Sequence, residues 1–367
     1  MRKFITFCIV LLIQLSIIYG IYRWYVSYET EKETATAIEK QIEPTVENNA
    51  KKVQNATIPK KNQILPETKK TQLKKDDNQI AKIPSDKFSK PFIYKYADWG
   101  DISSLPLSKL AKTGILVNID TRNVLWAKKC RVSVPIASMT KMMTILLVME
   151  AIKNKPDFSI DTEIQVTNEA YRIGGSQVYL DPKEKFSVKD LLKTVIIKSA
   201  NDSSYLLAQY LGGGDIHSFV NEMNKKAKQI GMPNAHFSNP DGLPEKYSTN
   251  DNKATAEGLV FLAERLLQYP LVVKDAQTKL AWLREGTKKK TMLINTNKLV
   301  RSGFTGITGM KTGYIRRSGF CLTATCERGG KRLVAVVTGF KSSKDRDKFV
   351  KQLLNWGYKQ NSLIENK

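Results

Sequence analysis

Three short patterns in this chain combine residue types that can carry out acyl transfer without a catalytic histidine. Ser138 and Lys141 form a Ser-x-x-Lys pattern, Ser199 and Asn201 form a Ser-x-Asn pattern, and residues 311–313 read Lys-Thr-Gly. A lone Ser-x-x-Lys is common by chance, whereas all three patterns in this order and at these separations are a specific signal. Together they predict a serine nucleophile that is activated by a lysine.

The first pattern opens an apolar stretch, residues 139–152, which we expect to be helical. Ser138 and Lys141 then lie one turn apart on the same helix face. Lysine is protonated at neutral pH, but burial and neighbouring positive charge lower its pKa. We therefore predict Ser138 as the nucleophile and Lys141 as its general base, over a capping serine and a solvated lysine.

The two histidines of the chain, His217 and His236, argue against a Ser-His-Asp hydrolase. Such a triad needs a histidine held by a carboxylate and directed at the serine. Neither histidine flanks a serine in a strained strand-to-helix turn, so we interpret both as structural residues.

The formal net charge of +24 would suit nucleic acid, a membrane surface or an anionic envelope polymer. The sequence contains no zinc-finger spacing, no aromatic RNA-binding signature and no compact basic helix, so we expect no nucleic-acid partner. Lysines scattered over a linker and over surfaces favour a protein that faces anionic envelope polymers.

The residues around the three patterns resemble the serine D-Ala-D-Ala carboxypeptidases, the low-molecular-mass penicillin-binding proteins of peptidase family S11. The matching segments cover the catalytic unit, roughly from residue 105 to residue 358. They are residues 135–144, 198–202, 237–243, 309–314 and 354–358.

The resemblance implies a role for each remaining residue of the second and third patterns. Ser199 would relay a proton to the leaving amine, and Asn201 would orient Lys141 and the substrate amide; a plain helix cap is the competing interpretation. Lys311 would supply positive field and Thr312 a hydroxyl for the substrate carboxylate. Gly313 would give clearance for close backbone approach at the start of an edge strand.

The resemblance also implies contacts around the reacting carbonyl. The backbone N–H groups of Ser138 and Tyr314 would form an oxyanion hole. Arg346 would grip the terminal carboxylate of the substrate, although a surface salt bridge is nearly as good an interpretation. Within the Gly-Gly-Ser-Gln loop that starts at residue 174, the candidates for substrate contact are Gly175, Ser176 and Gln177.

The expected reaction follows from this resemblance. The enzyme would remove the terminal D-Ala from peptidoglycan stem pentapeptides through a Ser138 acyl-enzyme, β-lactams would acylate Ser138, and no cofactor or metal is implied. A D,D-endopeptidase would use the same site. A serine β-lactamase would need a deacylating carboxylate, for which Glu245 is the nearest candidate, and a non-enzymatic envelope-binding protein would have lost a motif residue.

The N-terminal part of the chain predicts attachment to the cytoplasmic membrane. Residues 1–26 hold two basic residues before an apolar run of nearly 20 residues, and a bulky aromatic flank favours an uncleaved anchor over a removed signal. Residues 27–95 are polar and poor in aromatic residues, which predicts a disordered linker. Residues 96–367 would then form the catalytic domain on the extracytoplasmic side.

The order of the remaining elements predicts an α+β fold. Hairpins are expected at both ends of the domain, around residues 120–123 and 327–330. Helices are expected between and after them, at residues 188–197, 203–211, 216–230, 254–267 and 346–358. This pattern predicts an antiparallel sheet packed by helices, with an all-helical subdomain. The resemblance implies that this fold is of the β-lactamase and penicillin-binding-protein type.

The three cysteines of the predicted domain are Cys130, Cys321 and Cys326. Cys321 and Cys326 are five residues apart on an expected strand, so they should point to opposite faces and not pair with each other. A bridge from Cys130 to either of them stays open, although we favour free, buried thiols.

Overall fold

The computed structural model describes residues 94–96, 102–232, 234–244 and 250–364, with side chains described up to residue 360. The predicted membrane anchor at 1–26 and most of the predicted linker lie outside the described residues. Tyr94 is buried, and β1 (Lys95–Tyr96) pairs in parallel with β3 (Asn123–Lys128). The folded domain therefore includes the last two residues of the predicted linker.

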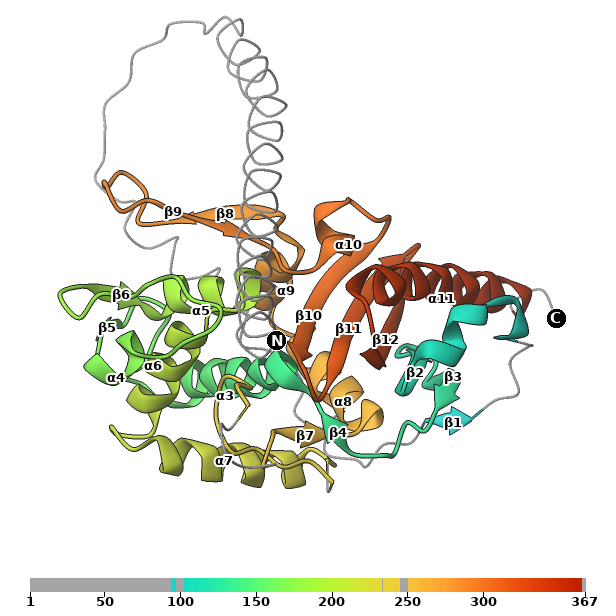
Figure 1. Ribbon diagram of the computed structural model, residues 1–367, viewed down its shortest axis with the longest axis horizontal. Coiled ribbons are helices and arrows are strands. Elements are labelled where there is room, and N and C mark those ends of the chain that lie inside the picture. Colours follow the sequence, from blue (N-terminus) through green and yellow to red (C-terminus); the bar gives the residue numbers. More distant parts are fainter. Residues whose placement is uncertain (1–93, 97–101, 233, 245–249, 365–367) are drawn as a thin grey trace, which may run out of the picture. The chain divides into compact units, whose positions relative to one another are not determined.

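A six-stranded sheet forms one half of the domain, in the order β1-β3-β2-β12-β11-β10 (Figure 1). All neighbouring strands except β1 and β3 are antiparallel, and both predicted hairpins are confirmed: β2 pairs with β3, and β11 with β12. The four remaining strands are β2 (Thr113–Asn118), β10 (Ile307–Ile315), β11 (Gly319–Arg328) and β12 (Lys331–Phe340).

Helices cover both faces of this sheet because successive strand residues are apolar on both sides. On one face Leu322 and Leu333 pack against α11 (Ser343–Ile364). On the other face, Val334 and Val336 belong to the core that includes α3 (Lys141–Asn154) and α8 (Ala256–Leu266). The predicted α+β fold, with an antiparallel sheet between helices, is confirmed.

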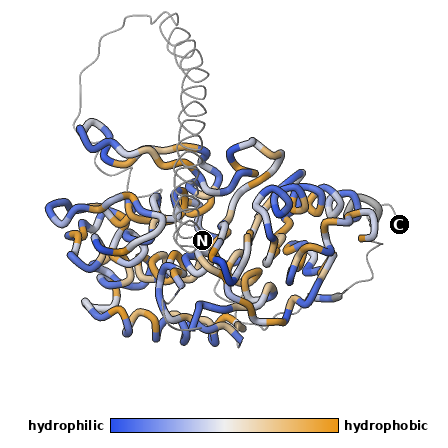
Figure 2. The backbone as a smooth tube through the Cα atoms, viewed as in Figure 1, coloured by the Kyte–Doolittle hydropathy of each residue, from blue (hydrophilic) through white to orange (hydrophobic). Residues whose placement is uncertain are grey.

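The helical subdomain follows α3 in the chain, and its predicted helices agree with the observed ones to within two residues. The helices of the subdomain are α4 (Asn168–Tyr171), α5 (Val188–Ile197), α6 (Asn201–Leu211) and α7 (Ile216–Gln229). The helix α7 alternates hydrophobic and hydrophilic residues along its turns, as expected for a helix with one face on the core (Figure 2).

Several short elements had no clear pattern in the sequence. Two-stranded sheets pair β4 (Val134–Pro135) with β7 (Lys253–Ala254), and β5 (Glu163–Gln165) with β6 (Lys185–Ser187). A hairpin of β8 (Leu280–Leu283) and β9 (Thr291–Ile294) lies against α5. The short helices are α9 (Pro270–Gln277), α10 (Lys298–Arg301), and the 3-10 helices η2 (Ile102–Ser104), η3 (Pro106–Leu110) and η4 (Ala137–Thr140).

The cysteine predictions agree with the structure. Cys130, Cys321 and Cys326 are buried thiols outside any disulfide, so no bridge joins Cys130 to either strand cysteine. Cys321 belongs to the core on one face of the sheet and Cys326 to the core on the other. Within the described ranges, none of the helices has the length and apolarity that crossing a bilayer requires.

Candidate active site

The proposed nucleophile lies in the tight turn that leads into α3. Ser138 is half-buried in η4, and Lys141 is the first residue of α3. The Lys141 Nζ donates a hydrogen bond to the Ser138 Oγ over 3.1 Å. The expected adjacency of hydroxyl and amine on one helical turn is therefore present, although the turn is 3-10 rather than α-helical at the serine.

The Lys141 amine is enclosed by three oxygen acceptors. Besides Ser138 it donates to Asn201 Oδ1 over 2.6 Å and to the backbone carbonyl of Asp241. Its side chain is fully buried, and burial lowers the pKa of Lys141 to about 8. At pH 7 a pKa of about 8 leaves roughly a tenth of the amine neutral and able to accept a proton, far more than in an ordinary lysine.

The prediction that neighbouring positive charge helps to lower the pKa of Lys141 is supported by Lys311. Burial and the charges of Lys141 and Arg346 hold the pKa of Lys311 well below its usual range, and repulsion between Lys141 and Lys311 disfavours the charged form of both amines. The carboxylates of Asp241 and Asp202, to which the sequence assigned no role, oppose burial and raise the pKa of Lys141.

The second pattern forms the turn between α5 and α6. Asn201 is the first residue of α6, and Ser199 precedes it in a left-handed backbone conformation with φ of 64°. Both side chains are buried, and the Ser199 Oγ accepts a hydrogen bond from Lys311 Nζ over 2.8 Å. A single serine with positive φ in a cleft is typical of strain held at a functional site.

The third pattern lies on β10, which is the edge strand of the sheet as expected. Lys311 does not start this strand, because β10 begins four residues earlier, at Ile307. The predicted clearance at Gly313 has a direct cause: a Cβ there would lie 2.6 Å from the carbonyl oxygen of Ile136 and 3.3 Å from Met139 Cγ. Glycine thus lets the edge strand lie directly against the nucleophile turn.

Thr312 and Tyr314 lie on either side of this glycine. The Thr312 hydroxyl donates to the Thr296 hydroxyl over 2.8 Å, and the Tyr314 ring is 56% exposed and stacked on Phe320. The oxyanion hole from the Ser138 and Tyr314 backbone N–H groups stays a prediction.

Arg346 is buried at the start of α11, where its Nε and Nη2 both donate to Asp347 Oδ1, over 2.9 Å and 2.7 Å. Its Nη1 also donates to the carbonyl of Cys321, the residue paired with Gly313 on the neighbouring strand. Arg346 therefore contributes positive charge behind Lys311, and the predicted grip on a substrate carboxylate stays untested.

The loop at residues 174–177 is held against the second pattern. The Asn201 side-chain amide donates to the Gly174 carbonyl, and the Asn201 backbone N–H donates to the Ser176 carbonyl, both over 2.7 Å. A Cβ at Gly175 would lie 2.6 Å from Asn201 Nδ2, which explains glycine at this position. These contacts hold the loop beside Asn201, while substrate contact by Gly175, Ser176 and Gln177 stays a prediction.

The structure also brings in residues to which the sequence assigned no role. The Asp241 carbonyl accepts from Lys141, and Gly242 packs so closely on the nucleophile turn that a Cβ would lie 2.1 Å from the Ala137 carbonyl oxygen. Asn252, which is buried, donates to the Thr140 hydroxyl and to the Asn239 carbonyl. The Asn-Pro-Asp-Gly pattern at 239–242 signals a turn, but not what the turn contacts.

Neither histidine belongs to the group of residues formed by the three patterns. The backbone of His236 pairs with that of Lys253 in an isolated bridge, and His217 lies in the first turn of α7, where the Asp215 carboxylate caps the helix. The ranges that the structure describes contain no group of three His, Cys, Asp or Glu side chains suited to a metal ion.

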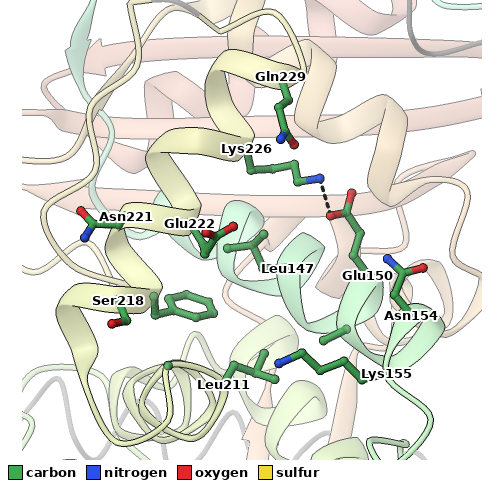
Figure 3. Close-up of a pocket in the computed structure, with 13 residues that line it drawn as sticks. Leu147, Glu150, Asn154, Lys155, Leu211, Ser218, Asn221, Glu222, Lys226 and Gln229 are labelled. Carbon is green, nitrogen blue, oxygen red and sulfur yellow. Dashed lines mark ion pairs between the residues drawn. The ribbon is translucent and has the colours of Figure 1, made fainter.

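A hollow of about 600 Å³ lies away from these catalytic groups, between α3 and α7 (Figure 3). An ion pair between Lys226 and Glu150 spans it, with Nζ and Oε2 2.6 Å apart. None of the residues of the three patterns lines this hollow. Size alone therefore does not locate the chemistry of this protein.

Comparison with known proteins gives a consistent result. A family model described as D-alanyl-D-alanine carboxypeptidase matches residues 102–342. D-alanyl-D-alanine carboxypeptidase DacF of Bacillus subtilis is 38% identical over 254 residues, which are 69% of this chain and 64% of DacF. DacC of Escherichia coli is 32% identical over 259 residues, 68% of this chain and 61% of DacC. The chain thus matches less than two thirds of the length of these curated relatives.

Solved structures agree with these sequence matches. Penicillin-binding protein D2 from Listeria monocytogenes, in its ampicillin-bound form, has a TM-score of 0.59 and 28% identity over 68% of this chain and 97% of that one. The D-alanyl-D-alanine carboxypeptidase DacD from Francisella tularensis has a TM-score of 0.62 and 27% identity, and the match covers 74% of both chains.

Proposed function

The chain belongs to the D-alanyl-D-alanine carboxypeptidase family, peptidase family S11, and we propose that it removes the terminal D-Ala from peptidoglycan stem pentapeptides. One observation carries the proposal. The Ser138 hydroxyl, the buried Lys141 amine and Asn201 form one hydrogen-bonded group, and a second buried lysine, Lys311, bonds to Ser199 beside it. This arrangement suits a serine nucleophile that transfers an acyl group.

In the first step the neutral Lys141 amine takes the proton of Ser138 as Oγ attacks the carbonyl carbon of the penultimate D-Ala. The 3.1 Å separation of Nζ and Oγ allows direct transfer. The Asn201 and Asp241 oxygens fix the position of the amine, so that it is oriented before the substrate arrives. The substrate carbonyl oxygen would be stabilised by the backbone N–H groups of Ser138 and Tyr314.

The terminal D-Ala must leave with a proton on its amine. Ser199 Oγ accepts a hydrogen bond from Lys311, so its own proton is available for the leaving amine. Ser199 then regains a proton from Lys141, which took one from Ser138. Burial, Lys141 and Arg346 all lower the pKa of Lys311 and disfavour its charged form, which makes this lysine a ready partner for proton movement. Water then hydrolyses the ester at Ser138 and restores the free serine.

β-Lactams should inhibit this protein, because their strained amide resembles the D-Ala-D-Ala peptide bond and offers Ser138 the same attack. One structural neighbour, penicillin-binding protein D2 of Listeria monocytogenes, has been solved in an ampicillin-bound form. The same chemistry at Ser138 would leave a long-lived ester.

We propose further that the N-terminal segment tethers the enzyme to the cytoplasmic membrane, with the catalytic domain on the extracytoplasmic face. The apolar run after Arg2 and Lys3 and the polar residues that follow it support this location. Cross-linked peptidoglycan is found on that side, where a tethered domain would reach stem peptides.

Release of D-Ala tests the proposed reaction. Purified protein incubated with a soluble stem pentapeptide should release one D-Ala per peptide, and Ser138→Ala should abolish the release. Ser133→Ala is the matched control, because this exposed serine donates to the Asn234 carbonyl and belongs to none of the three patterns. If the protein cleaves cross-linked peptide dimers but releases no D-Ala from pentapeptides, its activity is that of a D,D-endopeptidase and not of a carboxypeptidase. Glu245, the candidate for a β-lactamase, lies outside the described residues.

A further inference from the structure

Two exposed tyrosines flank the loop that contacts Asn201. Tyr171 ends α4 and is 55% exposed, and Tyr179 is 76% exposed. They lie three residues before Gly174 and two residues after Gln177. Large exposed aromatic side chains beside a catalytic cleft are candidates for ligand contact, because covering their apolar rings with a ligand is favourable.

The Tyr179 ring is held outward by the buried residues on either side of it. Its neighbours Val178 and Leu180 are fully buried, and the backbone N–H of each donates to the carboxylate of Asp202. Asp202 directly follows Asn201 on α6. Tyr179 itself has a positive φ of 55°, which a non-glycine residue adopts at a cost.

The hairpin β8–β9 holds the same loop from the other side. Arg284, at the end of β8, donates to the carbonyls of Val178 and Tyr179 over 3.1 Å and 2.9 Å. Its guanidinium also pairs with Glu184 over 2.7 Å. The exposed ring is therefore presented by a loop that two elements fix, so its position is preorganised for a ligand.

A hollow of about 540 Å³ lies between this loop and the hairpin. The tip of the hairpin is hydrophilic in Figure 2 and contains Lys289, which is half-exposed and pairs with Asp181 over 2.8 Å. The hollow is lined by Tyr171, Tyr179, Pro182, Arg284, Lys289 and Thr291, among others.

The chemistry of the hollow narrows the choice of ligand. Arg284 and Lys289 are already paired with Glu184 and Asp181, so they do not form a free basic patch for a polyanion. The backbone of the loop is also occupied: the N–H groups of residues 178 and 180 and the carbonyls of residues 178 and 179 already form hydrogen bonds. Few backbone groups of the loop are therefore left to pair with a bound peptide strand. What remains exposed is aromatic surface with hydroxyl groups, together with the side chain of Lys183, which is one lysine and not the cluster of charge that a polyanion needs.

We propose that this hollow, with Tyr171 and Tyr179, binds a sugar ring of the peptidoglycan glycan. This inference rests on the proposed function for the identity of the polymer. The C–H face of a pyranose stacks on a tyrosine ring, while its hydroxyl and acetamido groups exchange hydrogen bonds with the tyrosine hydroxyls. The loop links this subsite to Asn201 through the Gly174 and Ser176 carbonyls.

The test is a binding measurement on full-length protein that carries Ser138→Ala, so that no ligand is consumed. Three probes are titrated by calorimetry: the stem pentapeptide, the same pentapeptide joined to its N-acetylglucosamine–N-acetylmuramic acid disaccharide, and the disaccharide alone. We expect the disaccharide-pentapeptide to bind more tightly than the pentapeptide. Adding Tyr179→Asn should weaken binding of the sugar-bearing probe about threefold to tenfold and leave the pentapeptide unchanged.

Asparagine is chosen because it tolerates the left-handed conformation better than tyrosine does, so the variant should melt at no lower temperature. Tyr171→Ala removes the second ring from a position with ordinary φ and should act in the same direction. Tyr210→Asn is the matched control: this tyrosine is also exposed, but it stacks on Phe158 and lines a different hollow.

Equal affinity of the two pentapeptide probes for the Ser138→Ala protein would overturn the proposal. So would an equal loss for both probes in Tyr179→Asn and Tyr171→Ala. D-Ala release by protein with Ser138 intact reports the proposed function separately. If the protein releases D-Ala but does not prefer the sugar-bearing probe, the proposed sugar subsite is wrong and the proposed function stands. If it binds the sugar-bearing probe more tightly but does not release D-Ala, the carboxypeptidase activity is wrong and the sugar subsite stands.

Discussion

Lys141 is the residue on which the proposed chemistry depends, because its amine has to be neutral beside the hydroxyl that we propose it deprotonates. Burial provides this state, with a pKa of about 8, and the carboxylates of Asp241 and Asp202 oppose it. The spacing of the sequence was enough to identify the lysine and its serine. It could not reveal the opposing carboxylates, because both lie far along the chain from Lys141 and only the tertiary fold brings them to it.

The acylation rate should therefore depend on pH in a defined direction. Below the pKa of about 8 a growing fraction of Lys141 is protonated and cannot accept the serine proton, so the rate should fall about tenfold per pH unit. Stopped-flow measurement of acylation by a chromogenic cephalosporin between pH 5 and pH 9 gives this acidic limb of the pH–rate profile. A rate that is constant from pH 5 to pH 9 would contradict a lysine base.

Asp241→Asn should move this limb to lower pH. The carboxylate of Asp241 raises the pKa of Lys141, so its removal lowers that pKa and leaves more neutral amine in acid. The asparagine oxygen can still accept from the Leu243 N–H, as the carboxylate does now. The same acylation assay should give a lower midpoint pH than for the wild-type protein. A higher midpoint would show that the Asp241 carboxylate does not raise the pKa of Lys141. Asp215→Asn, in an exposed helix cap, is the control.

At the scale of elements, the site is made where the edge strand β10, the turn η4 and the start of α6 meet. The sequence predicted the helices and both main hairpins because their periodicities are strong, and α5 was placed to the residue. It missed the hairpin β8–β9 and placed Lys311 at the start of a strand. Short strands of mixed polarity carry little periodic signal, and their pairing is decided by tertiary contacts.

Gly313→Ala should separate these elements. The new Cβ would meet the Ile136 carbonyl oxygen at 2.6 Å, so β10 must move away from the nucleophile turn. We expect the second-order rate constant of penicillin acylation to fall about 100-fold. Gly329→Ala, where an added Cβ meets nothing within 4 Å but φ is +54°, is the control for backbone strain without a clash, and it should leave acylation unchanged. Unchanged acylation in Gly313→Ala would show that the strand does not need this close approach.

At the scale of the whole molecule, the chain enters the catalytic domain through a buried contact. The Tyr94 hydroxyl donates a hydrogen bond to the buried Glu264 carboxylate, and Arg122 lies over the Tyr94 ring. The sequence-based boundary put Tyr94 in the linker, because aromatic residues without a clear periodicity, such as Phe92, Tyr94 and Tyr96, do not reveal a partner 170 positions later. The membrane segment and the rest of the linker stay predictions.

Tyr94→Phe should therefore destabilise the domain without touching the active site. Loss of the hydroxyl removes a hydrogen bond from a buried carboxylate, which should lower the free energy of unfolding by about 1–3 kcal/mol. Urea denaturation followed by circular dichroism measures the change. Tyr210→Phe, at an exposed position, should change it by less than about 0.5 kcal/mol. Equal stability of Tyr94→Phe and wild type would show that this contact does not hold the chain.

The central claim is that Ser138 forms a covalent acyl-enzyme, and peptide mapping by mass spectrometry after reaction with benzylpenicillin tests it most directly. The account predicts one penicilloyl group per chain, carried by the peptide that contains Ser138, and no adduct in Ser138→Ala. An adduct on another residue, or one that persists in Ser138→Ala, would contradict it.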